Sequence, residues 1–421
     1  MTIQITTLDN GLRIATDTMQ EAESAVIGAW VGVGTRHEPW AANGIAHLVE
    51  HMMFKGTKKR SAYGLSAAIE KNGGSMNAHT TREETAYYAR VLPEDAALAI
   101  DIIADMLQNS VFQPKELDRE KKVIIQEIGR DLDSPEDHAF DLMYRLAFPK
   151  QKIGRSILGS TKTISGLPRR AISDYVKRYY HAGNMVIVGA GKIQHKELVA
   201  LARKHFARPP RGRKPALEKA RIASGAKLAP KTIEQLHIIL GFGGPSFNSR
   251  NLYAAQLLSI LLGGSSTSRL FQKVREKRGL VYTVNSAHTA FMDTGLFQIY
   301  AGTDPARAGE LIPVICNELR DVTRNITPGE LNLAKAQSRA DLLMGQENVM
   351  RRADMLGHQI LAFGRPMSIE AILRKLMAVT RNDVQAMATR LFRQRPLLTA
   401  LGPIDQLEDY KKIAARLTSA R

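Results

Sequence analysis

Two histidines and a glutamate lie close together in one short segment of the sequence. His47 and His51 are four residues apart, and Glu50 directly precedes the second histidine. Residues four apart share one face of an α-helix, so both imidazoles can reach one metal ion. Zinc accepts histidine nitrogens, and His-x-x-Glu-His is a known zinc-helix pattern. The spacing therefore predicts a zinc site in which Glu50 reaches a water on the ion without being a ligand.

The segment that carries these residues is otherwise apolar. Leu48, Val49, Met52 and Met53 surround them, which is typical of a buried helix. Because such a setting does not favour solvated histidines, we discount the alternative that the helix carries two histidines by accident.

A catalytic zinc takes three protein ligands and keeps one position open, so a third ligand must come from elsewhere. In the segment 116–131, Glu120 and Glu127 fall on one helical face together with Leu117, Ile124 and Ile128. An unpaired carboxylate at Glu127 would be costly among isoleucines, and a cation would remove that cost. Glu120 is placed to orient a metal-bound histidine. The spacing alone leaves three other candidates for the third ligand: Glu83, Glu84 and Glu116.

The length and composition of the chain are typical of a globular protein with two domains. A chain of 421 residues favours two domains. The apolar fraction is 44%, and no apolar run approaches the roughly 20 residues of a membrane helix. The first residues do not resemble a signal peptide and instead predict a strand hairpin at Asn10-Gly11. The single cysteine, Cys316, excludes an intramolecular disulfide. We expect a cytoplasmic, bacterial protein, although a processed mitochondrial matrix protein would look the same.

The net charge of +18 raises the question of a nucleic-acid partner. Much of the excess lies in Arg203–Lys231, which is rich in proline, glycine and basic residues and lacks periodicity. We favour a solvated basic linker over residues 209–231. No zinc knuckle or RNA-binding aromatic signature supports the alternative, so we expect no nucleic-acid partner. Because no apolar run is long enough to span a bilayer, we also expect no membrane partner.

The two halves of the chain resemble each other. In each half a strand-like stretch leads into a helix that opens at a proline, Pro93 in the first half and Pro305 in the second. The order of strands and helices predicts an α+β fold of two homologous α/β sandwich domains, each a sheet with helices packed on one face. We expect an N-terminal catalytic domain over 1–208 and a C-terminal domain over 232–421.

The predicted metal ligands are absent from the second half. Aligning Pro93 with Pro305 places Ser259, Leu262 and Gly263 at the positions of His47, Glu50 and His51. The second copy keeps the apolar helix and lacks the polar trio. The trio is therefore expected to serve chemistry rather than packing.

Several segments of the chain are similar to those of the M16 family of zinc peptidases. These are HLVEH at 47–51, MNAHTTREETAYYARV at 76–91, EKKVIIQEI at 120–128 and SRLFQKVREKRGLVYTV at 268–284. The sequence most resembles the short branch that includes the β subunit of mitochondrial processing peptidase and its bacterial relatives. The likeness covers essentially the whole chain. It implies mostly antiparallel sheets, His47, His51 and Glu127 as ligands of one Zn2+, Glu50 as general base, and Glu120 as an acid that supports a ligand.

The resemblance also gives a role to the second half. From the residues alone, Arg275 and Tyr282 are an exposed arginine and a strand tyrosine. In the family a matching arginine and tyrosine reach the scissile region, where they hold a carbonyl and an oxyanion. Because this chain has one pair of domains, the resemblance implies a homodimer in which these residues act in trans. A heterodimer with a different chain stays open.

A strand near the zinc motif is expected to bind the substrate. The segment around 76–91 predicts a strand, a turn and a strand, and an edge strand binds extended peptides by backbone pairing. The family uses the segment that matches Asn77, Ala78, His79 and Thr80. His79 departs from the tyrosine expected there.

The function indicated is a zinc-dependent endopeptidase for short or unfolded peptides. The alternative is a non-catalytic core or partner subunit of a processing-peptidase-like complex. Relatives with that role lose the zinc trio, whereas this chain retains it.

Overall fold

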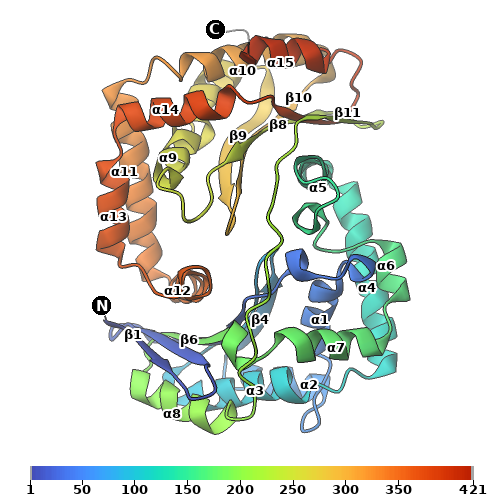
Figure 1. The fold of residues 1–421 in the computed structure, drawn as a ribbon, viewed down its shortest axis with the longest axis vertical. Helices are drawn as coiled ribbons and strands as arrows, with labels where there is room; N and C mark the ends of the chain where they lie inside the picture. Colours follow the sequence, from blue (N-terminus) through green and yellow to red (C-terminus); the bar gives the residue numbers. More distant parts are fainter. Residues whose placement is uncertain (1, 419–421) are drawn as a thin grey trace. The chain divides into compact units, whose positions relative to one another are not determined.

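The computed structural model describes residues Thr2–Thr418, which divide into two compact units (Figure 1). Unit 1 comprises the residues up to Gly129, then Arg155–Glu218 and Leu343–Met367. Unit 2 comprises Arg130–Gly154, Lys219–Leu342 and the residues from Ser368 onward. Within the described residues, no helix combines the length and the apolar content needed to cross a membrane.

Unit 1 is built on a six-stranded sheet in the order β1-β2-β6-β3-β5-β4. Neighbouring strands are antiparallel except for the parallel pair β2 and β6. The predicted hairpin joins β1 to β2, and Gly11 in its turn has a φ of 86°, a region that favours glycine. The strands are β1 (Thr2–Thr7), β2 (Arg13–Thr18), β3 (Ala25–Val31), β4 (Ser75–Thr80), β5 (Thr85–Val91) and β6 (Met185–Gly191).

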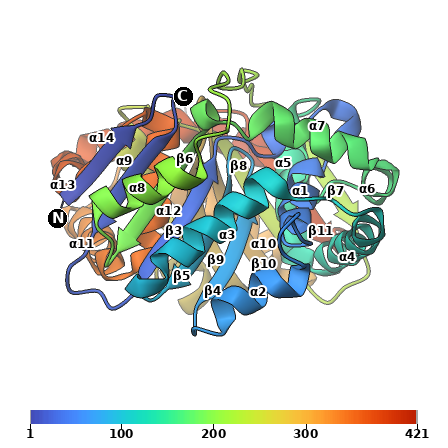
Figure 2. The same cartoon turned by 90° about the horizontal axis from the view of Figure 1, so that it is seen from below.

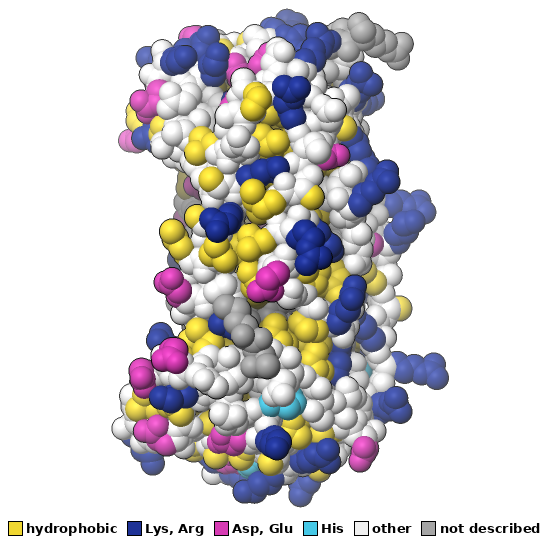
Figure 3. Space-filling view, turned by 90° about the vertical axis from the view of Figure 1, so that its left-hand side faces the viewer, with side chains coloured by type: hydrophobic (Ala, Val, Ile, Leu, Met, Phe, Trp, Pro, Cys, Tyr) yellow, Lys and Arg dark blue, Asp and Glu magenta, His cyan; other side chains and the backbone are white. Residues whose placement is uncertain are grey.

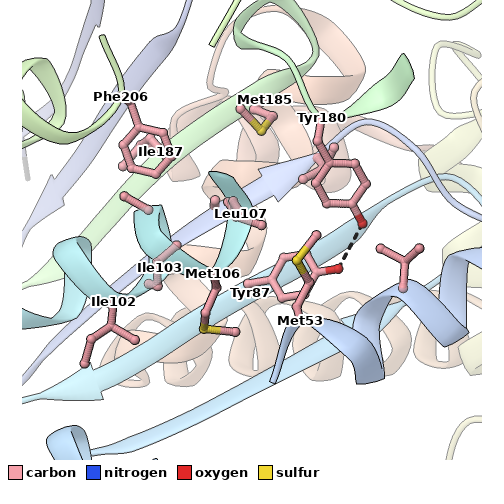
Figure 4. Packing of buried hydrophobic residues seen from close by; sticks show 14 of the residues in the cluster. Met53, Tyr87, Ile102, Ile103, Met106, Leu107, Tyr180, Met185, Ile187 and Phe206 are labelled. Carbon is pink, nitrogen blue, oxygen red and sulfur yellow. Dashed lines mark hydrogen bonds between the residues drawn. The ribbon is translucent and has the colours of Figure 1, made fainter. Parts of the chain in front are cut away.

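Most helices of unit 1 cover one face of this sheet, as Figure 2 shows for α3 and α8. They meet the sheet through alternate strand residues such as Ile27, Ala29 and Val31, as the two-residue period of a strand requires. Figure 4 shows part of this core, where Tyr87 and Tyr180 share a hydrogen bond of 2.9 Å. The helices are α1 (Ile45–Met53), α2 (Ala62–Glu70), α3 (Ala96–Asn109), α4 (Pro114–Asp133, which continues into unit 2), α6 (Thr161–Gly166), α7 (Arg169–Tyr179), α8 (His195–His205) and α12 (Val349–Phe363).

The other face of the sheet of unit 1 is covered by α12, a helix from the C-terminal half of the sequence. Leu356 and Ile360 of α12 pack against Val26 and Trp30 of β3, which point away from the other helices. Gly357 lies so close to Trp30 that a Cβ there would be 2.6 Å from the indole Cγ. The central strands β3 and β6 are therefore buried on both faces.

Unit 2 is built on a five-stranded sheet in the order β7-β11-β8-β10-β9, with one parallel pair, β7 and β11. This order repeats β2-β6-β3-β5-β4 of unit 1, without a counterpart of β1 among the described strands. Its strands are β7 (Gly225–Pro230), β8 (Leu236–Gly244), β9 (Val281–Ala290), β10 (Gly295–Thr303) and β11 (Leu397–Gly402). Its helices are α5 (Pro135–Ala147), α9 (Leu252–Gly263), α10 (Ala308–Asp321), α11 (Pro328–Met344, which continues into unit 1), α13 (Ile369–Ala378), α14 (Arg381–Phe392), α15 (Tyr410–Thr418) and a π-helical turn, Phe271–Glu276.

The second face of the sheet of unit 2 is covered by α5, a helix from the N-terminal half. Met143 and Ala147 of α5 pack with Ile239, Leu397 and Tyr300 of the strands. The two halves thus exchange one helix each. The division into units differs from the expected continuous domains 1–208 and 232–421. The reason is that one face of each sheet is covered by a helix from the other half of the sequence.

The predicted basic linker is partly structured. Residues 225–230 form β7 at the edge of the sheet of unit 2, and the unit boundary lies earlier, between Glu218 and Lys219. Figure 3 views the protein from the side of α11 and α13 and shows lysine and arginine side chains dispersed over that face among hydrophobic ones.

Candidate metal centre

The residues of the predicted zinc motif lie on α1, which begins at a tightly packed turn. Gly44 precedes the helix with a φ of 92°, and a Cβ there would be 2.6 Å from a methyl group of Ile164. Leu48, Val49 and Met52 form the buried face of α1. His47, Glu50 and His51 are consequently directed to the opposite face, where each is partly buried.

The two histidines and Glu127 of α4 converge. The Nε2 atoms of His47 and His51 lie 3.8 and 3.7 Å from Oε2 of Glu127. The imidazole rings are 4.6 Å apart at 71°. One ligand atom from each of these three residues lies within 4.8 Å of the other two, and no other set of histidine, cysteine and carboxylate groups among the described residues meets this condition.

These three residues fit a zinc ion. Tetrahedral zinc with donors at about 2.0–2.1 Å keeps its donors roughly 3.4 Å apart, so the separations from Glu127 need to shrink by only a few tenths of an ångström. Two imidazole nitrogens and one carboxylate oxygen are a common set of catalytic zinc ligands. Burial, together with the smaller effect of the neighbouring His51, lowers the pKa of His47 to about 4. His47 is therefore neutral at neutral pH, as metal binding requires.

His51 is oriented by Glu120, as predicted from the spacing on α4. Nδ1 of His51 lies 3.0 Å from Oε2 of the buried Glu120, so that Nε2 is left for a metal. The other oxygen of Glu120 pairs with Nζ of Lys55 at 2.8 Å. Burial alone would raise the pKa of Glu120, but the bonds from His51 and Lys55 outweigh it and lower that pKa.

Sequence reasoning missed Lys55. It lies four residues after His51, a helical spacing that was a usable signal. By contrast, Nδ1 of His47 is buried and has no hydrogen-bond partner in the described part of the chain. Only His51 is therefore oriented by a carboxylate at its Nδ1 atom.

Glu50 shares the face of His47 and His51 without joining the ligand cluster. Its Oε2 accepts a hydrogen bond of 2.5 Å from the hydroxyl of Thr80. Burial raises the pKa of Glu50, and the Thr80 bond opposes this effect. A partly buried carboxylate with a raised pKa beside a metal site has the chemistry of a general base.

The three alternative third ligands have other partners. Glu83 pairs with Arg36 at 2.6 Å, and Glu84 contacts Nδ1 of His358 at 3.0 Å. Glu116 pairs with Arg119 on its own helix at 2.6 Å. Of the four carboxylates considered, only Glu127 lies at the imidazoles.

The predicted substrate segment forms most of β4, which is the last strand of the sheet and pairs only with β5. The side-chain Oδ1 of Asn77 accepts from the backbone N–H of Ala78 at 2.8 Å. The His79 ring lies 6.2 Å from that of Tyr88 on β5. Thr80, at the end of the strand, is the member of this set that reaches the motif on α1.

The remaining predicted site residues lie in unit 2. Arg275 belongs to the π-helical turn, and its guanidinium is 4.8 Å from the centre of the Phe271 ring. Tyr282 lies on β9, and 65% of it is exposed. On α9, Ser259, Leu262 and Gly263 are buried in place of the metal-binding trio.

Two family models match most of the chain. Residues 13–161 match the model described as insulinase (peptidase family M16), and residues 166–338 match the model described as peptidase M16 inactive domain. The second match covers α9, where the predicted ligands are absent, and the first covers the whole candidate metal centre.

Curated bacterial proteins are similar over nearly their whole length. One from Streptomyces coelicolor is 37% identical over 100% of this chain and 92% of its own. One from Rickettsia felis is 36% identical over 95% of this chain and 98% of its own. One from Bacillus subtilis is 34% identical over 94% of this chain and 97% of its own. All three are described as uncharacterized zinc proteases.

Solved structures share the fold at lower identity. A protease from Helicobacter pylori matches with a TM-score of 0.88 and 22% identity, over 96% of this chain and all of its own. A chain of complex III2 from Candida albicans, with Inz-5 bound, matches with a TM-score of 0.89 and 20% identity, over 99% of this chain and all of its own. These two likenesses concern the fold alone.

Proposed function

The chain belongs to the M16 family of zinc peptidases, and from this premise we propose that it is an endopeptidase that hydrolyses short or unfolded peptides. The observation that carries the proposal is the convergence of His47, His51 and Glu127 within 4.8 Å, with Glu50 on the same helix face as the two histidines. The zinc-protease descriptions of relatives along nearly the full chain support it.

His47, His51 and Glu127 would hold one zinc ion in unit 1. When bound, zinc supplies Lewis acidity, which makes a water easier to deprotonate and a carbonyl easier to attack. Glu120 keeps the His51 ring in the orientation that presents Nε2, because it accepts the hydrogen bond from Nδ1.

Glu50 is the group that moves the proton. Its carboxylate takes a proton from the attacking water and then delivers it to the nitrogen of the leaving amine. Because burial raises the pKa of Glu50, the carboxylate is a better proton acceptor than an exposed glutamate. Substitution by glutamine keeps the shape of the side chain and removes this capacity.

The substrate would be bound as an extended chain. β4 offers one backbone edge, since it hydrogen-bonds to β5 on its other side, and a peptide added there gains main-chain hydrogen bonds. Most backbone groups of a folded protein are already hydrogen-bonded and are not free to pair with this edge. We therefore assign peptides and unfolded chains as substrates, with Asn77, Ala78, His79 and Thr80 along the binding strand.

The experiment that tests this function combines metal analysis with an activity assay. Purified protein is expected to contain zinc at about one equivalent per chain and to cleave an internally quenched peptide. A chelator should abolish cleavage, and added zinc should restore it. Glu50→Gln should retain zinc and lose nearly all turnover. Zinc-independent cleavage, or full turnover by Glu50→Gln, would contradict the mechanism, whereas no cleavage of any peptide would favour the non-catalytic subunit.

We also propose that the protein acts as a homodimer, with Arg275 and Tyr282 of one copy serving the zinc site of the other. This proposal rests on the family resemblance and on the exposure of Tyr282. A guanidinium can hold a substrate carbonyl, and a phenol can donate to the oxyanion. Mixing Glu50→Gln chains with Tyr282→Phe chains should restore activity if the residues act in trans. No recovery after verified subunit exchange would argue against it.

A further inference from the structure

The hydroxyl of Thr80 joins the predicted substrate strand to the predicted general base. We propose that Thr80 is a positioning residue, which holds Oε2 of Glu50 so that Oε1 is the oxygen that takes the proton. The proposal rests on the peptidase function given above and assigns Thr80 a role beyond contact with a peptide.

The contact between the two side chains is short and directional. Oγ1 of Thr80 lies 2.5 Å from Oε2 of Glu50. An ionised carboxylate can only accept, so the threonine hydroxyl is the donor, and hydroxyl bonds to carboxylates are among the strong ones. In the described part of the chain, Thr80 is the only hydrogen-bond partner of the Glu50 carboxylate. The contact is therefore the one hydrogen bond that selects between the two oxygens.

Thr80 is itself held in place by buried structure. Its partner in the β4–β5 register is Thr85, a fully buried residue whose hydroxyl donates to the backbone oxygen of Val33 at 2.8 Å. The hydroxyls of Thr80 and Thr85 are 3.5 Å apart. A β-branched side chain in a strand has few rotamers open to it. The position of the Thr80 hydroxyl is thus fixed by the strand and does not depend on its contact with Glu50.

Glu50 is equally constrained from its own helix. Val49 and Met52 bury the opposite face of α1 in the core of unit 1. The nearby phenols of Tyr87 and Tyr180 are hydrogen-bonded to each other at 2.9 Å (Figure 4). Among the described residues neither phenol is hydrogen-bonded to Glu50, so Thr80 is the donor that sets the rotation of the carboxylate.

A loss of this bond should slow catalysis and leave substrate binding intact. A misplaced catalytic group can cost on the order of 100-fold in rate for a shift of about 1 Å. Thr80→Val is nearly isosteric and keeps a β-branched residue in β4, so the backbone edge is preserved. We expect kcat to fall by about 10- to 100-fold, with KM and zinc content within about twofold of wild type, because only a group used in the transition state is disturbed.

The matched variant is Thr80→Ser, which retains the hydroxyl and should recover most of the lost kcat. Thr80→Ala also removes the hydroxyl but leaves a smaller side chain, and it should behave as Thr80→Val does. Unchanged kcat in both Thr80→Val and Thr80→Ala would overturn the proposal. A rise in KM at constant kcat would also overturn it, since it would show that Thr80 serves only the peptide.

A second measurement does not depend on activity. In zinc-free protein, the infrared difference spectrum between wild type and Thr80→Val should show a shifted carboxylate stretch. The same pair compared in a Glu50→Gln background should lack this band. If the wild type fails to cleave peptides, the proposed function fails while this measurement still tests the Thr80–Glu50 contact. An absent shift overturns the positioning role.

Discussion

Oε1 of Glu38 accepts a hydrogen bond of 2.9 Å from the backbone N–H of Ala46, the residue directly before His47. Oε2 accepts from the N–H of Gly44 at 3.0 Å and from the side chain of Asn43 at 2.8 Å. The first N–H groups of a helix have no partner within the helix. One buried carboxyl group therefore satisfies the beginning of α1 and anchors the helix that carries the zinc motif.

We predict that Glu38→Ala destabilises unit 1 by about 2–3 kcal/mol, because two buried backbone N–H groups and the side chain of Asn43 lose their acceptor together. The zinc affinity should fall as well, since α1 is no longer fixed at its start. Thermal unfolding and competition with a zinc chelator measure the two effects. Glu70→Ala, at the exposed end of α2, is the control and should change neither by much. A variant as stable as wild type would contradict the anchoring role.

The stability of unit 1 should also depend on pH through Glu38. Burial raises the pKa of Glu38 to about 7, against the opposing bonds from Ala46, Asn43 and Gly44. The unfolded carboxyl has the ordinary pKa of 4.5. Between these two values the folded protein keeps a proton that the unfolded chain has lost. The contribution of Glu38 is therefore fully present below pH 4.5 and declines as the pH rises to about 7, by up to about 1.4 kcal/mol per pH unit.

The test compares wild type with Glu38→Gln, which does not titrate. The stability of wild type relative to the variant should fall as the pH rises through that window and become constant above it. Unfolding followed by circular dichroism at a series of pH values measures this difference. Parallel curves for the two proteins would show that Glu38 does not titrate with a raised pKa.

Lys55 is predicted to support zinc binding from a distance. It occupies the oxygen of Glu120 that His51 leaves free, and loss of such supporting bonds typically weakens metal affinity by about 10- to 100-fold. Lys55→Met should show a loss in this range, and Lys55→Arg should retain most of the affinity. Lys58→Met, at an exposed position nearby, is the control. Equal zinc affinity in Lys55→Met and wild type would refute the prediction.

The exchanged helix α12 should be sensitive to added volume. At Gly357 a new Cβ would lie 2.6 Å from Cγ of the fully buried Trp30. Overpacking of this kind costs about 1–3 kcal/mol, so Gly357→Ala should lower the melting temperature of unit 1. Gly129→Ala, on α4 with nothing within 4 Å of the added Cβ, should be neutral or stabilising by up to about 1 kcal/mol. Similar melting temperatures for the two variants would mean that α12 does not pack tightly on the sheet.

The sequence by itself determined what depends on local spacing. The helical repeat placed His47, Glu50 and His51 on one face of α1, and Glu120 with Glu127 on one face of α4. The turn at Gly11 and the repeated order of strands in the two halves were likewise predicted and are confirmed. In each case neighbours along the chain fix the geometry, because the period of a helix or strand is a property of the backbone.

The tertiary structure alone decided which distant segments meet. It brought Glu127 to the imidazoles and gave the three rival carboxylates other partners. It also brought Thr80 to Glu50 and Glu38 to the start of α1, and it placed α5 of the N-terminal half in unit 2 and α12 of the C-terminal half in unit 1. Such contacts depend on sheet register and core packing, which bring together residues far apart in the chain. The local period of a helix or strand does not specify which distant residues come into contact.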